Sequence, residues 1–115
     1  MDEREGLLTM NAREILDANF EIKEGSFLYY LQNKQTFRKE AFRELYESIK
    51  QLSDENVGIT DTARKINFVY GQVLKCFMYH FDVADAYKIA KLPPQYNKIL
   101  QLFENNVFYY FQTRI

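Results

Sequence analysis

The stretch AFRELYESIKQL, residues 41–52, decides the fold class of this chain. Its apolar residues recur at steps of three and four positions, and polar or charged residues fill most of the positions between them. An α-helix makes one turn every 3.6 residues, so this spacing gathers the apolar side chains on one face of an amphipathic helix. That face consists of Phe42, Leu45, Tyr46, Ile49 and Leu52.

The same periodicity predicts helices on both sides of this stretch. Upstream, Asn11 and Glu14 have the spacing of a capping box, in which the two residues bond each other's backbone. Downstream, a long helix extends to about residue 81 and is apolar over most of its circumference, which is typical of a central helix. A polar loop at residues 53–58 separates the two longest helices. The candidate N-caps are Asn11, Ser26, Thr36, and either Thr60 or Asp61.

The second half of the chain contains the residues that break or strain a helix. Gly71 lies inside the long helix, where glycine costs ~1 kcal/mol relative to alanine, so we expect a second helix to cross closely there. Asp82 ends the long helix or caps a short one over residues 83–91. Pro93 and Pro94 then break the chain, and Pro94 suits the first turn of a final helix. That helix presents to the core Tyr96, Ile99, Leu100, Phe103, Val107 and Phe111.

These segments predict an all-α fold, a compact antiparallel bundle of five to six helices without a sheet. The chain has 115 residues, of which 47% are hydrophobic, enough to bury a single core. We expect residues 11–115 to form one helical domain and residues 1–10 to form a flexible leader or a short turn.

Charge and composition exclude several function classes. A net charge of −1 argues against nucleic-acid binding, because such binding depends on an excess of bases. Cys76 is the only cysteine, so the chain holds no internal disulfide and no multi-cysteine zinc site, and its composition suits the cytoplasm. The longest apolar-rich window, residues 66–81, is too short and too polar for a membrane span. Residues 1–10 show no secretory signal.

Cys76 and His80 are the sharpest candidates for chemistry, because residues four apart share a helical face. With Asp82 and Asp85 they could bind zinc, and a cysteine–histidine pair could also act in catalysis. We expect neither role, because the sequence offers no second ligand cluster and a mid-helix apolar position does not lower the pKa of a thiol. The sequence thus predicts a protein that is not an enzyme, with no catalytic, cofactor-binding or metal-binding residues.

Four aromatic residues, Phe108, Tyr109, Tyr110 and Phe111, occupy consecutive positions of the final helix. A helix has one core-facing side, so these side chains cannot all point inward. We expect Phe108 and Tyr109 to project beside the core face and Tyr110 to adjoin it. Tyrosine is favoured at protein interfaces, although a tyrosine can equally well be buried with its hydroxyl bonded. The candidate partner-binding residues are Leu102, Asn106, Phe108, Tyr109, Tyr79 and Tyr29.

The function that we predict is non-catalytic protein binding, as in inhibitors, immunity proteins and antitoxin-like regulators. This step is an association from size and fold class and rests on no motif. Residues 1–56 hold twelve acids and eight bases, whereas residues 57–115 hold four acids and seven bases. The basic half favours an acidic partner, unless the two halves neutralise each other inside the bundle. The alternatives are a homodimer formed through the final helix, and a small-molecule- or metal-binding bundle that uses Cys76 and His80.

Overall fold

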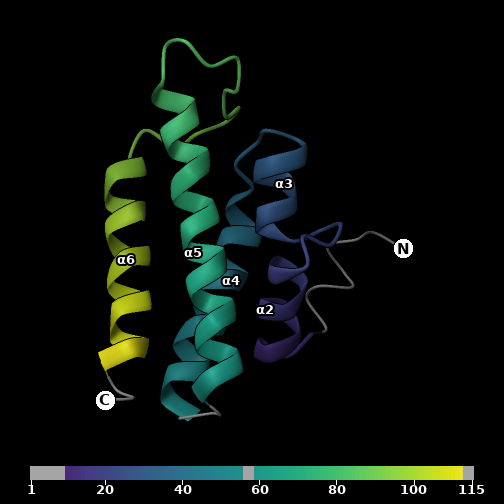
Figure 1. Ribbon diagram of the computed structural model, residues 1–115, viewed down its shortest axis with the longest axis vertical. Coiled ribbons are helices and arrows are strands. Elements are labelled where there is room, and N and C mark those ends of the chain that lie inside the picture. Colours follow the sequence, from purple (N-terminus) through teal and green to yellow (C-terminus); the bar gives the residue numbers. More distant parts are fainter. Residues whose placement is uncertain (1–9, 56–58, 113–115) are drawn as a thin grey trace.

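The computed structural model describes residues 10–55 and 59–112, which contain five α-helices and the loops between them (Figure 1). The helices are α2 (Ala12–Phe20), α3 (Phe27–Asn33), α4 (Lys39–Glu55), α5 (Ile59–Phe81) and α6 (Tyr96–Gln112). Within these ranges there is no strand, only an isolated parallel bridge between Thr36 and Ala90. The prediction of an all-α bundle is therefore confirmed. The predicted leader, apart from Met10, lies outside the described residues.

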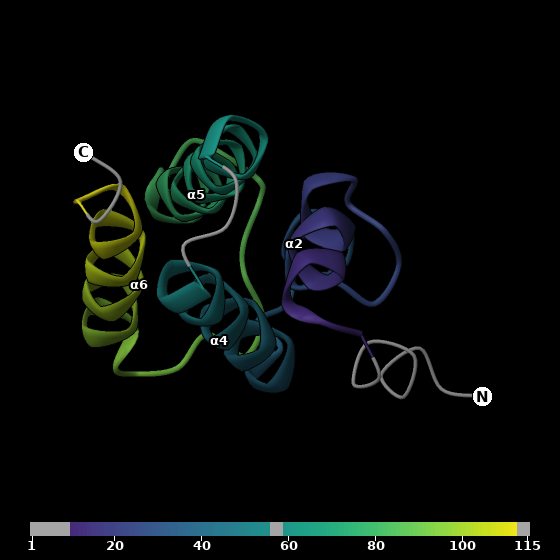
Figure 2. The same cartoon turned by 90° about the horizontal axis from the view of Figure 1, so that it is seen from below.

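The long helices α4, α5 and α6 run antiparallel to their neighbours in the chain (Figure 1). Helix α6 and helix α2 lie at opposite ends of the bundle, with α4 and α5 between them (Figures 1 and 2). Helix α6 packs against α4 and α5, and α2 packs against α4, α5 and α3. One side of α6 consequently forms an outer edge of the described molecule.

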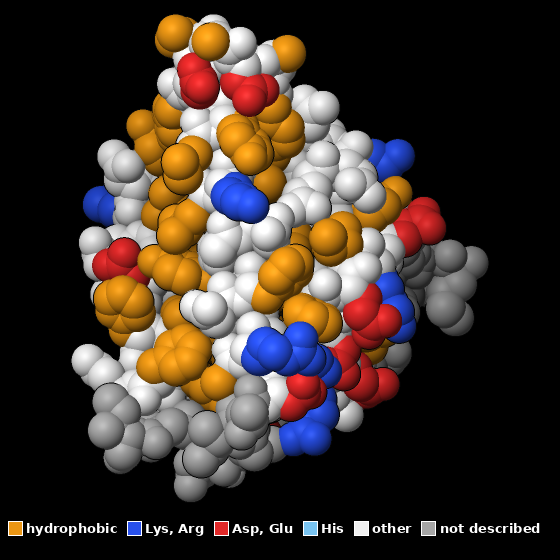
Figure 3. Space-filling model, viewed as in Figure 1, with side chains coloured by type: hydrophobic (Ala, Val, Ile, Leu, Met, Phe, Trp, Pro, Cys, Tyr) orange, Lys and Arg blue, Asp and Glu red, His pale blue; other side chains and the backbone are white. Residues whose placement is uncertain are grey.

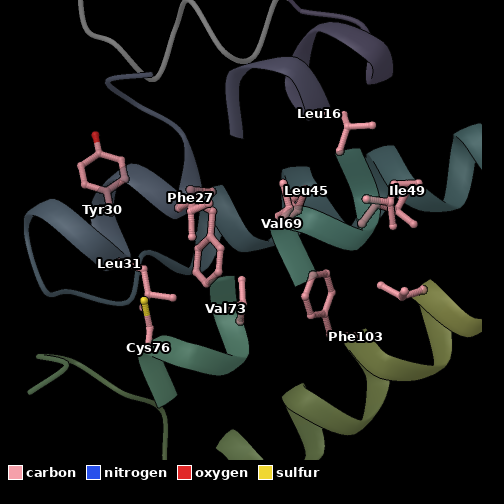
Figure 4. Close-up of a cluster of buried hydrophobic side chains, with 14 of the residues drawn as sticks. Leu16, Phe27, Tyr30, Leu31, Leu45, Ile49, Val69, Val73, Cys76 and Phe103 are labelled. Atoms are coloured by element: carbon pink, nitrogen blue, oxygen red, sulfur yellow. The ribbon is translucent and has the colours of Figure 1, made fainter. Parts of the chain in front are cut away.

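All five helices contribute to one hydrophobic core (Figure 4). Leu45 and Ile49 of α4 and Val69 and Val73 of α5 lie at its centre and are inaccessible to solvent or nearly so. Phe103 packs from α6, with its ring centroid 5.7 Å from that of Phe42 in α4. Of the face that the spacing of residues 41–52 predicts, Leu45, Ile49 and Leu52 are buried, whereas Phe42 and Tyr46 are only half-buried.

The first two helices begin where their capping residues predict. The amide of Glu14 donates to Asn11 Oδ1 at 2.9 Å and the amide of Asn11 donates to Glu14 Oε1 at 3.2 Å, which completes a capping box. Ser26 Oγ accepts from the amide of Tyr29 at 3.2 Å and caps α3. Such caps are each worth ~1 kcal/mol, which matters for helices of nine and seven residues.

Three predicted helix boundaries are wrong. Thr36 does not cap α4, which begins at Lys39; instead Thr36 pairs with Ala90. Helix α4 also continues to Glu55, through residues predicted as loop. There the buried hydroxyl of Ser53 donates to the carbonyl of Ile49 at 3.0 Å, which lets a polar residue remain inside a helix. Helix α5 begins at Ile59, so both candidate caps, at positions 60 and 61, lie within its first turn.

Gly71 does not mark a helix crossing, contrary to prediction. A Cβ added at Gly71 would meet no atom within 4 Å beyond its own helix backbone, and the residue is only half-buried. The prediction failed because it took the wide apolar circumference of α5 as a sign that neighbours cover all sides. Instead, Phe68, Met78 and Tyr79 are apolar or aromatic residues that α5 leaves exposed.

Helix α5 ends at Phe81, so of the two alternatives for Asp82 the first holds: it ends the long helix, and residues 82–95 form a loop instead of a short helix. Lys88 Nζ donates to the carbonyls of His80, Asp82 and Asp85 at 2.9, 3.0 and 3.0 Å. Asp85 Oδ1 accepts from the amide of Tyr87 at 2.8 Å. Side chains that bond to nearby backbone groups in this way compete with the hydrogen bonds of a helix, which is why the segment forms a closed loop.

Candidate protein-binding surface

Helix α6 divides its large side chains between the core and the surface. Phe103 and Tyr110 are fully buried, whereas Leu102 is 53% exposed, Phe108 50% and Tyr109 48%. The placement of Phe108 and Tyr109 agrees with the prediction that the four consecutive aromatics cannot all point inward. Tyr110 is more buried than expected, since it belongs to the core face rather than only adjoining it.

A band of hydrophobic side chains runs along the contact between α5 and α6 (Figure 3). We define the α5–α6 band as Tyr70, Phe81, Tyr96 and Phe108. The Phe81 and Tyr96 rings lie 5.1 Å apart, and the Tyr70 and Phe108 rings lie 6.5 Å apart. Phe81 and Phe108 are about half exposed, so much of this band meets solvent.

One polar contact interrupts the α5–α6 band. Tyr70 Oη donates to Glu104 Oε2 at 3.2 Å. Partial burial of Tyr70, together with the negative charge of Glu104, raises the pKa of the Tyr70 hydroxyl. The hydroxyl therefore stays protonated and serves as a donor that ties α5 to α6.

A groove lies on the other flank of α6, between α6 and α4. This α4–α6 groove has a volume of about 220 Å³ and is lined by Phe37, Lys39, Phe42, Arg43, Tyr46, Ile99 and Leu102. Its floor is aromatic, with the rings of Phe42 and Tyr46 6.2 Å apart and those of Phe42 and Phe37 5.7 Å apart. Two cations, Lys39 and Arg43, are the charged residues of the lining.

Asn106 fixes the distance between the two helices that form this groove. Its Nδ2 donates to the carbonyl of Tyr46 at 3.1 Å, and the residue is buried. Asn106 therefore does not extend the exposed surface of α6, although it was predicted to do so with Leu102. Asn106 therefore has a structural role, because its hydrogen bond joins α6 to α4.

The two cations of the groove carry no ion pair to another described residue. The ion pairs within the described ranges are formed by Lys23, Arg64 and Lys65 with their acidic neighbours. Lys39 and Arg43 are both exposed. The pair thus offers positive charge beside an apolar surface.

Tyr79 and Tyr29, the other candidate contact residues, lie on the opposite side of α5 from α6. Tyr79 is 45% exposed, and its ring lies 6.4 Å from that of Tyr87 in the 82–95 loop. Tyr29 is half-buried in α3, with its ring centroid 5.6 Å from that of Tyr30. Helices α3 and α6 flank α5 from different sides (Figure 1). The structure therefore does not join these two tyrosines to the surface of α6.

Cys76 and His80 both hold the 82–95 loop. Burial raises the pKa of the Cys76 thiol, and the Tyr87 hydroxyl lies beside it. That hydroxyl donates in turn to the carbonyl of Leu31. His80 Nδ1 accepts from the amide of Ile89 at 2.8 Å. A raised thiol pKa is the opposite of what a nucleophile needs, and both side chains already have structural partners.

No group of three or more His, Cys, Asp or Glu side chains among the described residues is arranged to hold a metal ion. No helix in residues 10–55 and 59–112 is both long enough and apolar enough to cross a membrane. Comparisons of the chain with protein-family models, curated proteins and solved structures gave no match. A proposal of function for this chain therefore rests on its surface.

The sequence prediction missed the α4–α6 groove, although a signal for it was present. Lys39 and Arg43 are four residues apart, as are Phe42 and Tyr46, so each pair lies one helical turn apart. Helix α4 therefore carries bases and aromatics along one flank. What the spacing alone could not tell is that this flank faces α6.

Proposed function

We propose that this chain is a non-catalytic protein-binding domain that uses α6 and the surfaces on its two flanks. The observation that supports it is the half-exposure of Leu102, Phe108 and Tyr109 on one helix at the edge of the bundle. Exposed apolar patches mark interaction sites on monomeric proteins, and such side chains lie on both flanks of α6. Tyrosine and phenylalanine bury a large area with little loss of rotamer freedom, which suits them as interface anchors.

A cytoplasmic inhibitor, immunity protein or antitoxin-like regulator would use such a surface to cover its partner. Self-association through α6 is the second candidate, because the α5–α6 band could pack against a second copy of itself. A metal- or small-molecule-binding role for Cys76 and His80 has less support, since both side chains are engaged in holding the 82–95 loop.

Site-specific photocrosslinking in the native host tests this proposal. A benzoylphenylalanine placed at Tyr109 keeps an aromatic ring on the exposed side of α6. A matched control carries the same group at Lys75, an exposed position of α5 away from α6. We expect a discrete crosslinked species from position 109 and none from position 75. Its mass separates the candidates: a second copy of the chain indicates a homodimer, and a different protein indicates a partner.

Equal crosslinking from both positions, or a crosslink only from position 75, would contradict the proposal. Binding of the identified partner is then measured with purified proteins, because a crosslink by itself does not establish affinity. Replacement of Tyr109 by alanine should weaken that binding by at least about thirtyfold, as expected of an aromatic anchor.

A further inference from the structure

We infer that the α4–α6 groove binds an acidic amphipathic helix of a partner protein. The helix places apolar side chains in the groove and carboxylates on Lys39 and Arg43. This inference rests on the proposed function and deepens it, because it names the chemistry of the partner and the part of the surface that it occupies.

The shape of the site favours a peptide over a small ligand. The α4–α6 groove, at about 220 Å³, is smaller than the ~300–1,000 Å³ typical of drug-sized ligand sites. It is open on one side and bounded by two long helices, the arrangement in which an amphipathic helix is bound as a third. Leu102 of α6 and Tyr46 of α4 line the groove from its two helices, so the groove can accept individual apolar side chains of a bound peptide.

A second hollow lengthens the groove toward the start of α4. It has a volume of about 410 Å³ and shares Phe37 and Lys39 with the α4–α6 groove. Its lining residues include three bases and a single acid. They are Phe37, Arg38, Lys39, Glu40, Lys91, Leu92, Pro93 and Pro94. An extended surface of two adjoining hollows matches a segment of several turns better than it matches a compact molecule.

The charges around the groove select an acidic segment. Lys39 and Arg43 lie one turn apart on α4, with ~5–6 Å between Cβ atoms at such a spacing, so they can meet carboxylates one turn apart on a bound helix. Across the groove, Lys98 is one turn from Leu102 on the same flank of α6. The first turn of α4 adds the positive end of its helix dipole.

Glu40 and Glu44 of α4 do not line the α4–α6 groove, although Glu40 lines the second hollow beside Lys39. Glu40 and Glu44 each follow one of the two cations by a single residue, which rotates them by about 100° around the helix. Further along, Gln51 and Glu55 line a hollow together with Asn11 and Arg13, on the side of α4 that meets α2. The charged residues that line the α4–α6 groove are therefore both bases, and bases outnumber acids three to one in the second hollow, a pattern that an acidic partner complements.

A displayed library of amphipathic helical peptides tests this inference. All members share a spacing of apolar residues at positions i, i+3, i+4 and i+7, and their polar positions vary freely between Asp, Glu, Lys, Arg, Ser and Gln. The full-length protein serves as bait at low salt. We expect enriched peptides to be acidic and to lose at least tenfold in affinity when Lys39 and Arg43 are both changed to glutamate.

Two further variants make the outcome specific. The control Lys34→Glu with Lys75→Glu changes the net charge equally at exposed positions away from the groove, and should keep the affinity within threefold. Leu102→Glu should weaken binding by at least tenfold, and its half-exposed position makes misfolding an improbable cause. Enrichment of non-acidic peptides, or equal losses in the groove and control variants, would overturn the inference.

The same selection separates failure of this inference from failure of the proposed function. Peptides that lose affinity with Tyr109→Ala or Phe108→Ala, but not with the groove variants, would overturn the acidic-helix assignment and leave α6 as the binding helix. Absence of any enriched peptide, together with absence of a crosslink from position 109, would contradict both.

Discussion

Replacement of Gly71 by alanine should stabilise the protein. Alanine is favoured over glycine inside a helix by ~1 kcal/mol, chiefly because glycine loses more backbone freedom on folding. The added methyl group would touch nothing within 4 Å outside its own helix, so no packing penalty offsets this gain. We expect an increase of ~0.5–1 kcal/mol in the free energy of unfolding, or roughly 2–4 °C in Tm for a domain of this size.

Urea denaturation followed by circular dichroism measures this change, and Gly25→Ala is the matched control. Gly25 precedes the cap of α3 with a φ of 96°, in the left-handed region that alanine avoids. The same chemical change should therefore cost ~1 kcal/mol or more at Gly25. A loss of stability in Gly71→Ala would refute this account of α5 and would indicate that a neighbouring helix does approach position 71.

Two substitutions and one labelling experiment test the structural contacts described above. Asn106→Ala removes the bond to the Tyr46 carbonyl and should cost ~1 kcal/mol in the free energy of unfolding; a cost near zero in urea denaturation would contradict a structural role. Lys88→Met should speed amide exchange at residues 82–91 more than in the core, and unchanged exchange would show that the three carbonyl contacts do not hold the loop. Because burial raises its pKa, Cys76 should react with iodoacetamide far more slowly than a free thiol at pH 8, and the rate should still rise above pH 9; rapid labelling of the native protein at pH 8 would contradict this.

The parts of the fold that depend on local chemistry could be predicted from the sequence. The capping box of Asn11 and Glu14 and the apolar face of residues 41–52 each involve residues within a few turns of one another. Their effects on the backbone do not depend on distant segments.

The parts that depend on distant contacts could not be predicted. Thr36 resembles a cap in sequence, yet Phe37 and Gln35 exchange backbone hydrogen bonds with Ala90, more than fifty residues away. The 82–95 loop likewise depends on Lys88 reaching back to the end of α5. Neither arrangement has a periodic signature, so the sequence alone could not decide whether Asp82 ends the long helix or caps a short one over residues 83–91.

The candidate surface likewise has some features that follow from local sequence and others that depend on distant contacts. That the aromatics of residues 108–111 must divide between core and surface follows from helical geometry alone, and Phe108 and Tyr109 are indeed half exposed. The burial of Asn106 depends on where α4 lies, because its partner is the Tyr46 carbonyl. The α4–α6 groove exists only once both helices are placed, which is why the sequence showed its residues but not their common site.

The affinity of Tyr109→Ala for the partner crosslinked at position 109, measured beside its stability, tests the central claim most directly. Isothermal titration calorimetry gives the affinity and urea denaturation gives the free energy of unfolding. The account predicts a loss of at least ~2 kcal/mol in binding free energy, about thirtyfold in Kd, with a much smaller change in stability. If Tyr109→Ala instead unfolds the protein while its folded fraction binds normally, the aromatic side chains of α6 serve the core. The binding surface would then lie on other helices.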